Sequence, residues 1–305
     1  MTPVRKSLLA LAALVALVVG GCGGRAPAAR DDGRRLRVVA TTTQVQDFTR
    51  IVGGDRVQVA GILKRGVDAH DYEPSPADLD AIARADVLVE NGVGLESWLD
   101  DTVRSAGFHG TVVDASRGVR LRQAGGEPDP HIWQNPRNAR LMAVNIERAL
   151  AAADPAGARR FRANLDAYAR RLDVLDAGIA RRIDGLASKK LVTNHDAFGY
   201  YVDRYGLDFV GSVIPSFDTS AELSARSVQD LVARIRAARV KAIFSESSLP
   251  PRTAETVGRE AGVRVVEGPD ALYGDSLGPP GSDAATYLRM MEHNSRTIVS
   301  ALAGT

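Results

Sequence analysis

Three of the chain's five histidines occur in similar sequence settings, and together they could bind a metal ion. His70, His131 and His195 each lie between an apolar, strand-like run and the start of a helix, with an aspartate one or two positions away. Neutral imidazole is the commonest protein ligand for metals. A single such histidine would more simply cap a turn or fill a pocket. Three at matching junctions indicate ligands that the fold brings together.

The elements that must position these histidines alternate between strands and helices, and the second half of the chain repeats the order of the first. The apolar runs cover residues 36–40, 57–62, 85–90, 111–114, 190–193, 209–213, 241–246 and 264–267. This alternation predicts an α/β fold of two lobes, each with a mainly parallel sheet flanked by helices. Such sheets bind ligands beyond the carboxyl ends of their strands, so we expect the metal between the lobes.

A long helix is expected to join the lobes. From Ala156 onward, apolar residues recur at spacings of three and four, and this spacing continues as far as Gly185. A helix of about 30 residues spans roughly 45 Å. An ordinary amphipathic surface helix is the alternative, but a strut is favoured because strand–helix alternation resumes directly after it. The expected divisions are a lobe at 36–154, the linking helix at 155–187 and a second lobe at 188–305.

The first 35 residues indicate export and membrane attachment. Arg5 and Lys6 precede a short apolar stretch, and small residues surround Cys22, the chain's one cysteine. This pattern is typical of a secretory signal and too short for a spanning helix. We predict that residues 1–21 are a signal peptide, that Cys22 is lipidated and that residues 22–35 form a flexible tether. The alternative is an ordinary signal with an incidental cysteine. A mature fold without a free thiol can have neither a disulfide nor a thiolate metal site.

The charge pattern argues against a nucleic-acid partner. The formal net charge is +2, and the basic residues are dispersed among acidic ones rather than grouped. Nucleic-acid binding usually leaves a basic patch or stripe.

A fourth metal ligand is expected from a loop of the second half. The segment 266–277 carries Asp270 and Asp275, and position alone does not distinguish them. Glu246 ends a strand that faces the same crevice, so it is a candidate hydrogen-bond partner for a ligand imidazole, with a structural role about equally supported. His109 and His293 lack the loop setting and are expected on the surface or in packing.

Several longer motifs are specific when taken together. They are His-Asp-Tyr-Glu-Pro-Ser-Pro-Ala-Asp at 70–78, Ala-Asp-Val to Trp at 85–98, Asp-Pro-His-Ile-Trp at 129–133, the loop of residue 195, and Tyr-Gly-Asp-Ser-Leu-Gly at 273–278. In these motifs the chain resembles the zinc- and manganese-binding substrate-binding lipoproteins of ABC transporters, the TroA-like metal receptors with a helical backbone. The resemblance covers essentially all of the mature chain.

The resemblance implies more than the residues alone. It implies two α/β lobes joined by one rigid helix with the metal in the cleft, and it selects Asp275 over Asp270 as the fourth ligand. It also implies a monomer, lipid-anchored to the outer face of the cytoplasmic membrane, that delivers its ion to a permease transmembrane subunit with a cytoplasmic ATPase. The His-rich insertion of many dedicated zinc members is missing, since residues 117–127 contain no histidine.

The ligand set favours Zn²⁺, with Mn²⁺ as the runner-up. Three imidazoles and one carboxylate suit zinc in near-tetrahedral geometry. Mn²⁺ is harder and prefers more oxygen donors. Many manganese members that resemble this chain hold a glutamate at the position of His195, so the zinc prediction depends on that residue.

Two other functions were weighed against metal capture. A secreted zinc hydrolase would need an open metal position and a base such as Asp275 or Glu246. The chain has no His-Glu-x-x-His helix and no nucleophile–base pair, and four protein ligands leave no obligatory open position. We therefore expect a binding protein and not an enzyme. A surface adhesin is a third alternative, for which no residue argues.

Overall fold

The computed structural model describes residues 34–304, apart from residues 125 and 222. The expected signal peptide, Cys22 and most of the expected tether lie outside the described residues. Within the described part, no helix combines the length and the apolar character needed to cross a membrane.

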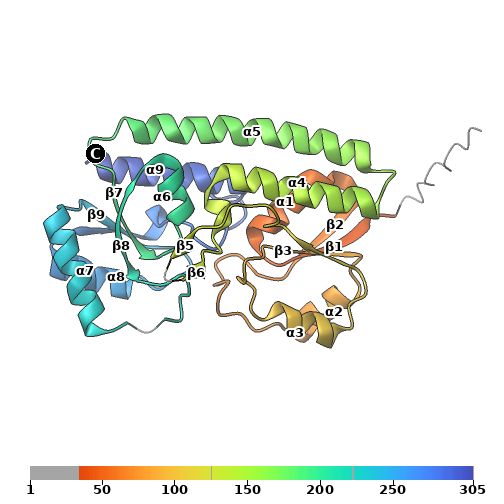
Figure 1. The fold of residues 1–305 in the computed structure, drawn as a ribbon, viewed down its shortest axis with the longest axis horizontal. Coiled ribbons are helices and arrows are strands. Elements are labelled where there is room, and N and C mark those ends of the chain that lie inside the picture. The colour runs from red at the N-terminus through yellow and green to blue at the C-terminus, as the bar shows by residue number, and fades with distance from the viewer. Residues whose placement is uncertain (1–33, 125, 222, 305) are drawn as a thin grey trace, which may run out of the picture.

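Two four-stranded parallel sheets form the centres of two lobes (Figure 1). The strands are β1 Leu36–Ala40, β2 Val57–Gly61, β3 Val87–Glu90 and β4 Thr111–Asp114, then β7 Lys190–His195, β8 Asp208–Ile214, β9 Ala242–Phe244 and β10 Arg264–Val266. Their orders are β2-β1-β3-β4 and β8-β7-β9-β10, so both lobes have the same topology. The predicted two-lobe α/β fold is confirmed. A short antiparallel pair, β5 Gln123–Ala124 and β6 Glu127–Pro128, was not expected.

Helices connect the strands and cover the sheets. They are α1 Thr43–Gly53, α2 Pro76–Ala83, α3 Leu99–Ala106, α4 Pro136–Ala153, α5 Ala158–Asp184, α6 Gly199–Tyr205, α7 Ala225–Ala238, α8 Arg252–Ala261 and α9 Tyr287–Ala303. Local sequence accounts for several starts. Ser75 and Asp78 form a capping box with Pro76 in the first turn of α2, and the Asn135 side chain accepts from Arg137 N at the start of α4.

The long helix begins later than predicted. It was expected from residue 155, but Asp154 is the C-cap residue of α4, and Gly157 is the N-cap residue of α5. The Asp154 carboxylate instead accepts from Gly157 N at 3.1 Å and forms an ion pair with Arg56 at 2.6 Å. An aspartate before proline can close a turn as readily as it caps a helix.

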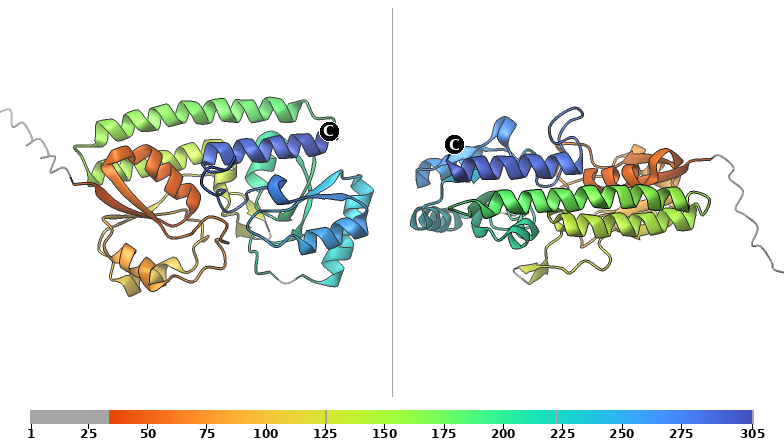
Figure 2. Two further views of the ribbon diagram at one scale, coloured as in Figure 1. Left: turned by 180° about the vertical axis from the view of Figure 1, so that it is seen from behind. Right: turned by 90° about the horizontal axis from the view of Figure 1, so that it is seen from above.

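The 27-residue helix α5 runs past both lobes (Figure 1). Its buried face has the predicted spacing of three and four residues, and it contacts α4, α1 and α9. Figure 2 shows α4 and α9 on either side of it. The buried residues of this face are Phe161, Leu165, Tyr168, Ala169, Leu172, Asp176, Ile179 and Ile183. Because the C-terminal helix α9 also returns to α5, one continuous hydrophobic core extends through both lobes.

Candidate metal centre

The structure brings together His70, His131, His195 and Asp275, which come from four different segments. His70 lies in the loop after β2, His131 just before the 3₁₀ turn Ile132–Gln134, and Asp275 in the segment after β10. His195 was expected in a loop, but it is the last residue of β7, because its backbone pairs with Ile214 of β8. One candidate ligand atom from each residue lies within 4.8 Å of all the others.

Most of the distances between these residues are close to those around a tetrahedral ion. His131 Nε2 lies 3.2 Å from His70 Nε2 and 3.4 Å from His195 Nε2. The Asp275 carboxylate oxygens lie 3.3 Å from His195 Nε2, 3.5 Å from His131 Nε2 and 3.8 Å from His70 Nε2. A tetrahedron with metal–ligand bonds of about 2.0–2.1 Å has edges of about 3.3–3.4 Å. The geometry therefore suits one small divalent cation.

Carboxylates fix the orientation of two of the rings. His131 Nδ1 lies 2.8 Å from Asp129 Oδ1, and His195 Nδ1 lies 2.8 Å from Glu246 Oε1. A carboxylate at Nδ1 holds the proton there, so in the neutral rings, the form that binds a metal, the lone pairs are on the Nε2 atoms that face each other. Two such acceptors cannot hydrogen-bond to one another. Both Asp275 oxygens are also buried without a hydrogen-bond donor, so the donor set fits a cation that all four residues would bind.

Burial and neighbouring charges shift the pKa values of His195 and Asp275 in opposite directions. Burial lowers the pKa of His195, but the carboxylates of Glu246 and Asp275 outweigh it and raise that pKa well above its ordinary value. Burial raises the pKa of Asp275, but the three histidines outweigh it and lower that pKa. Burial also lowers the pKa of His70. Asp275 is therefore an ionised carboxylate in the site.

His70 is held differently from the other two histidines. Its side chain is 8% exposed, whereas those of His131, His195 and Asp275 are fully buried. Its backbone N–H donates to Asp68 Oδ1 at 3.0 Å, and the Thr219 hydroxyl of the other lobe donates to Asp68 Oδ2 at 2.6 Å. A cavity of about 420 Å³ opens beside His70, lined also by Glu127, Phe217 and Asp218 among others. His70 is thus the ligand candidate nearest to solvent.

Contacts from the first lobe hold the segment that carries Asp275. The Trp133 indole N–H and the Gln134 side-chain amide both donate to Gly274 O, at 3.0 and 3.1 Å. A Cβ at Gly274 would lie 2.0 Å from Glu246 Oε2, so only glycine allows this close approach. The backbone next to Asp275 is therefore fixed from both lobes.

The remaining candidate residues lie elsewhere. Asp270 is exposed in the 3₁₀ turn Gly268–Asp270, outside the four-residue cluster, and His109 is exposed as well. His293 is buried, and its Nε2 lies 3.0 Å from Ala271 O, which agrees with a packing role. Sequence reasoning did not assign Asp129 a role, although it belongs to the motif around His131.

Comparisons with known proteins agree with this fold. The family described as "Zinc-uptake complex component A periplasmic" matches residues 38–301. The manganese-binding lipoprotein MntA of Halalkalibacterium halodurans is 30% identical, with 95% of this chain and 96% of that protein covered. The iron ABC transporter substrate-binding lipoprotein MtsA of Streptococcus pyogenes is 30% identical, with coverages of 88% and 89%.

A solved structure gives the same assignment. The periplasmic zinc-binding protein TroA from Treponema pallidum superposes with a TM-score of 0.83 at 30% identity, covering 89% of this chain and all of that one. The resemblance inferred from the motifs is confirmed. The chain therefore belongs to the family of the periplasmic zinc-uptake complex component A.

Proposed function

We propose that this chain is the extracytoplasmic receptor of a metal-uptake ABC transporter and that His70, His131, His195 and Asp275 bind its cargo ion. One observation carries the assignment of the ligands. Three imidazoles and a carboxylate whose two oxygens are buried without a hydrogen-bond donor bring their candidate ligand atoms within 4.8 Å of one another. Family membership and relatives named as ABC transporter substrate-binding lipoproteins support the receptor role.

We propose Zn²⁺ as the preferred cargo, with Mn²⁺ second. Three nitrogen donors and one oxygen donor at tetrahedral spacing favour zinc, whereas manganese prefers more oxygen ligands. The relatives are named for manganese, iron and zinc, so their names do not select one ion.

Metal capture accounts for the site better than hydrolysis does. The Glu246 carboxylate is held against His195 Nδ1, so it is not placed as a general base for a water molecule. Asp275 belongs to the ligand cluster itself. With four protein ligands the ion needs no bound water, as a catalytic zinc site would. The relatives reported above are named as metal-binding proteins or as a transporter's substrate-binding lipoprotein, which supports capture.

Delivery would require a membrane partner. The proposed partners are a permease transmembrane subunit and its cytoplasmic ATPase, and the proposed anchor is a lipid on Cys22 that keeps a monomeric receptor at the outer face of the membrane. The support is that several relatives are named as lipoproteins.

Metal titration of matched histidine variants tests the ligand assignment. The mature chain should bind one ion, as measured by elemental analysis and calorimetric titration with Zn²⁺. His131→Ala should lower the affinity by at least roughly 100-fold, because loss of a ligand exceeds the 10–100-fold cost of losing a ligand's hydrogen-bond partner. His109→Ala removes an exposed imidazole outside the cluster and serves as the control. Equal affinities for the two variants would overturn the assignment.

A further inference from the structure

The charge of the molecule is distributed unevenly. Residues 34–305 contain 35 basic and 35 acidic side chains, counting Lys, Arg, Asp and Glu. Helices α4, α5 and α9 together contain twelve arginines and six acidic residues, a net charge of +6. The rest of this part of the chain therefore carries −6. Such an asymmetry gives the two sides of a protein different electrostatic partners.

The basic helices and the cleft lie on opposite sides of the molecule. Helices α4, α5 and α9 lie together along one side of both lobes (Figures 1 and 2). The cavity beside His70 is lined by Glu127 of β6 and by Asp218, and β6 lies between the two lobes, away from α5 (Figure 1). The basic side formed by α4, α5 and α9 therefore faces away from the acidic residues at the cavity beside His70.

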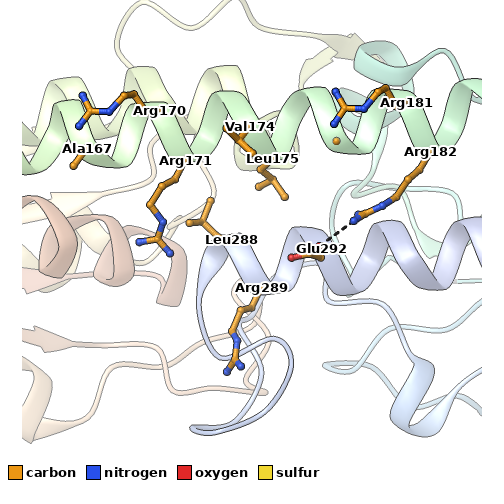
Figure 3. Close-up of a pocket in the computed structure, with 11 residues that line it drawn as sticks. Ala167, Arg170, Arg171, Val174, Leu175, Arg181, Arg182, Leu288, Arg289 and Glu292 are labelled. Carbon is orange, nitrogen blue, oxygen red and sulfur yellow. Dashed lines mark hydrogen bonds and ion pairs between the residues drawn. The ribbon is translucent and has the colours of Figure 1, made fainter.

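A groove of about 590 Å³ lies at the centre of the basic side, between α5 and α9 (Figure 3). Its lining combines five arginines with one acidic residue, Glu292. Glu292 is paired with Arg182 at 3.0 Å. Among the described residues, the other four guanidinium groups form no ion pair. These four are Arg170, Arg171, Arg181 and Arg289.

The groove also has an apolar component. Leu175 and Leu288 lie between the arginines, and Val174 is 72% exposed (Figure 3). Nearby acidic groups do not cancel the arginines, because Asp173 pairs with Arg140 and Asp166 with Arg162, at 3.6 and 3.4 Å. A cationic rim around apolar side chains fits a surface of phosphate groups above acyl chains, since guanidinium binds phosphate in a bidentate manner.

The segment between Cys22 and Arg34 is short enough to keep the lobes close to a membrane. Eleven residues separate Cys22 from Arg34, and a chain of that length spans at most about 40 Å. A lipid on Cys22 would therefore hold the lobes beside the membrane. A basic patch commonly supplies the second signal that stabilises a lipid-anchored protein on an anionic bilayer.

We propose that the face formed by α4, α5 and α9, with the groove at its centre, binds anionic phospholipid headgroups. This contact holds the receptor on the membrane with its metal-binding cleft directed away from the bilayer, where it collects ions. The receptor then leaves this orientation to present its cargo to the permease. The proposal rests on the membrane attachment proposed above and is independent of the identity of the ion.

Vesicle binding tests the proposal without the anchor. The mature chain with Cys22→Ser should cosediment with vesicles that contain phosphatidylglycerol, but not with vesicles of phosphatidylcholine alone, and added salt should release it. The triple variant Arg170→Gln, Arg171→Gln, Arg181→Gln should bind about tenfold more weakly or worse. The control triple variant Arg226→Gln, Arg234→Gln, Arg252→Gln removes the same charge from exposed sites on α7 and α8 and should bind nearly as wild type.

Each other outcome contradicts the proposal. Absence of wild-type binding to anionic vesicles, equal binding to neutral ones, or equal loss in both triple variants would overturn it. Release by inorganic phosphate at an ionic strength at which sodium chloride leaves the protein bound would assign the groove to a free anion instead of a bilayer. Zinc titration of the same proteins reports on folding and on the cleft separately, so a chain that binds vesicles but no metal would contradict the proposed function and leave this inference standing.

Discussion

The two lobes share one sheet topology but use the same position in it differently. In each, a polar residue at the end of the first strand or directly after it bonds through its side chain to a buried carboxylate from the segment after the third strand. In the first lobe the Thr41 hydroxyl donates to Glu96 Oε1 at 2.5 Å. In the second, His195 Nδ1 lies 2.8 Å from Glu246 Oε1. Glu96 and Glu246 are 6% and 1% exposed.

The two hydrogen bonds differ in whether the polar side chain keeps a second atom that can bind a metal. Glu96 also accepts from the backbone N–H groups of Asn91 and Gly92, so the Thr41 pair closes a network with its loop. The imidazole of His195 instead has a second ring nitrogen, and the bond at Nδ1 directs the lone pair of Nε2 into the cleft. The same scaffold position thus stabilises a loop in one lobe and orients a ligand in the other. The first lobe supplies its ligands from loops, through His70 and His131.

Substituting the two carboxylates should give the largest effects, on zinc affinity for Glu246 and on stability for Glu96. Glu246→Gln should weaken Zn²⁺ binding by about 10–100-fold, because a neutral amide orients the imidazole less firmly and lowers its basicity. Glu96→Gln should leave zinc affinity within about twofold and lower the free energy of unfolding by about 1–3 kcal/mol, since one buried acceptor becomes a donor. Calorimetric titration and urea denaturation measure the two effects. Similar losses of zinc affinity would mean that Glu96 also acts on the site.

Substitution of His195 tests whether the ligand from the second lobe selects the metal ion. His195→Glu replaces a nitrogen donor with oxygen and should shift the ratio of Zn²⁺ to Mn²⁺ affinity toward manganese by about tenfold or more. Competition titrations with both ions measure the ratio, and His109→Glu is the control for an added carboxylate outside the cluster. An unchanged ratio would show that the cleft selects the ion by geometry and not by ligand type.

Local patterns in the sequence predict the fold well but the site only in part. Strand–helix alternation and the spacing along α5 depend on local burial, so they predicted both lobes and the long helix. The three histidines stood out because each lies between a strand-like run and a helix start, near an aspartate. The sequence did not show which aspartate bonds to a ring, because that depends on side-chain direction. Only Asp129 bonds to the imidazole of its histidine, while Asp68 bonds to the backbone N–H of His70.

Other features of the site depend on contacts between distant segments. The hydrogen bond from Thr219 to Asp68 joins residues 151 positions apart, and no local pattern signals it. The choice of Asp275 over Asp270 came from family resemblance, because both lie in one polar segment. The sequence identified Glu246 as a candidate partner for a ligand imidazole, because its strand ends at the crevice, but it did not predict which histidine Glu246 bonds to.

The smallest expected effect concerns the acidic end of the first lobe's sheet. Glu90 ends β3, whereas Phe244 ends β9 at the equivalent position. Burial, together with the negative charges of Glu96, Asp114 and Asp100, raises the pKa of Glu90 from 4.5 to about 7. The folded protein therefore binds this proton more tightly than the unfolded chain does. The stability contributed by protonated Glu90 is present below about pH 4.5 and is lost as the pH rises through about 7.

Glu90→Gln should remove this dependence. Above pH 7 the variant should be more stable than wild type, by on the order of 1 kcal/mol after allowance for the partial exposure of Glu90. Well below pH 4.5 the two proteins should differ little, because wild-type Glu90 is then protonated in both states. Urea denaturation across this range, with chelator present so that bound metal does not add stability, measures the difference. A difference that stays constant with pH would mean that Glu90 acts through packing and that its charge does not distinguish the two sheets.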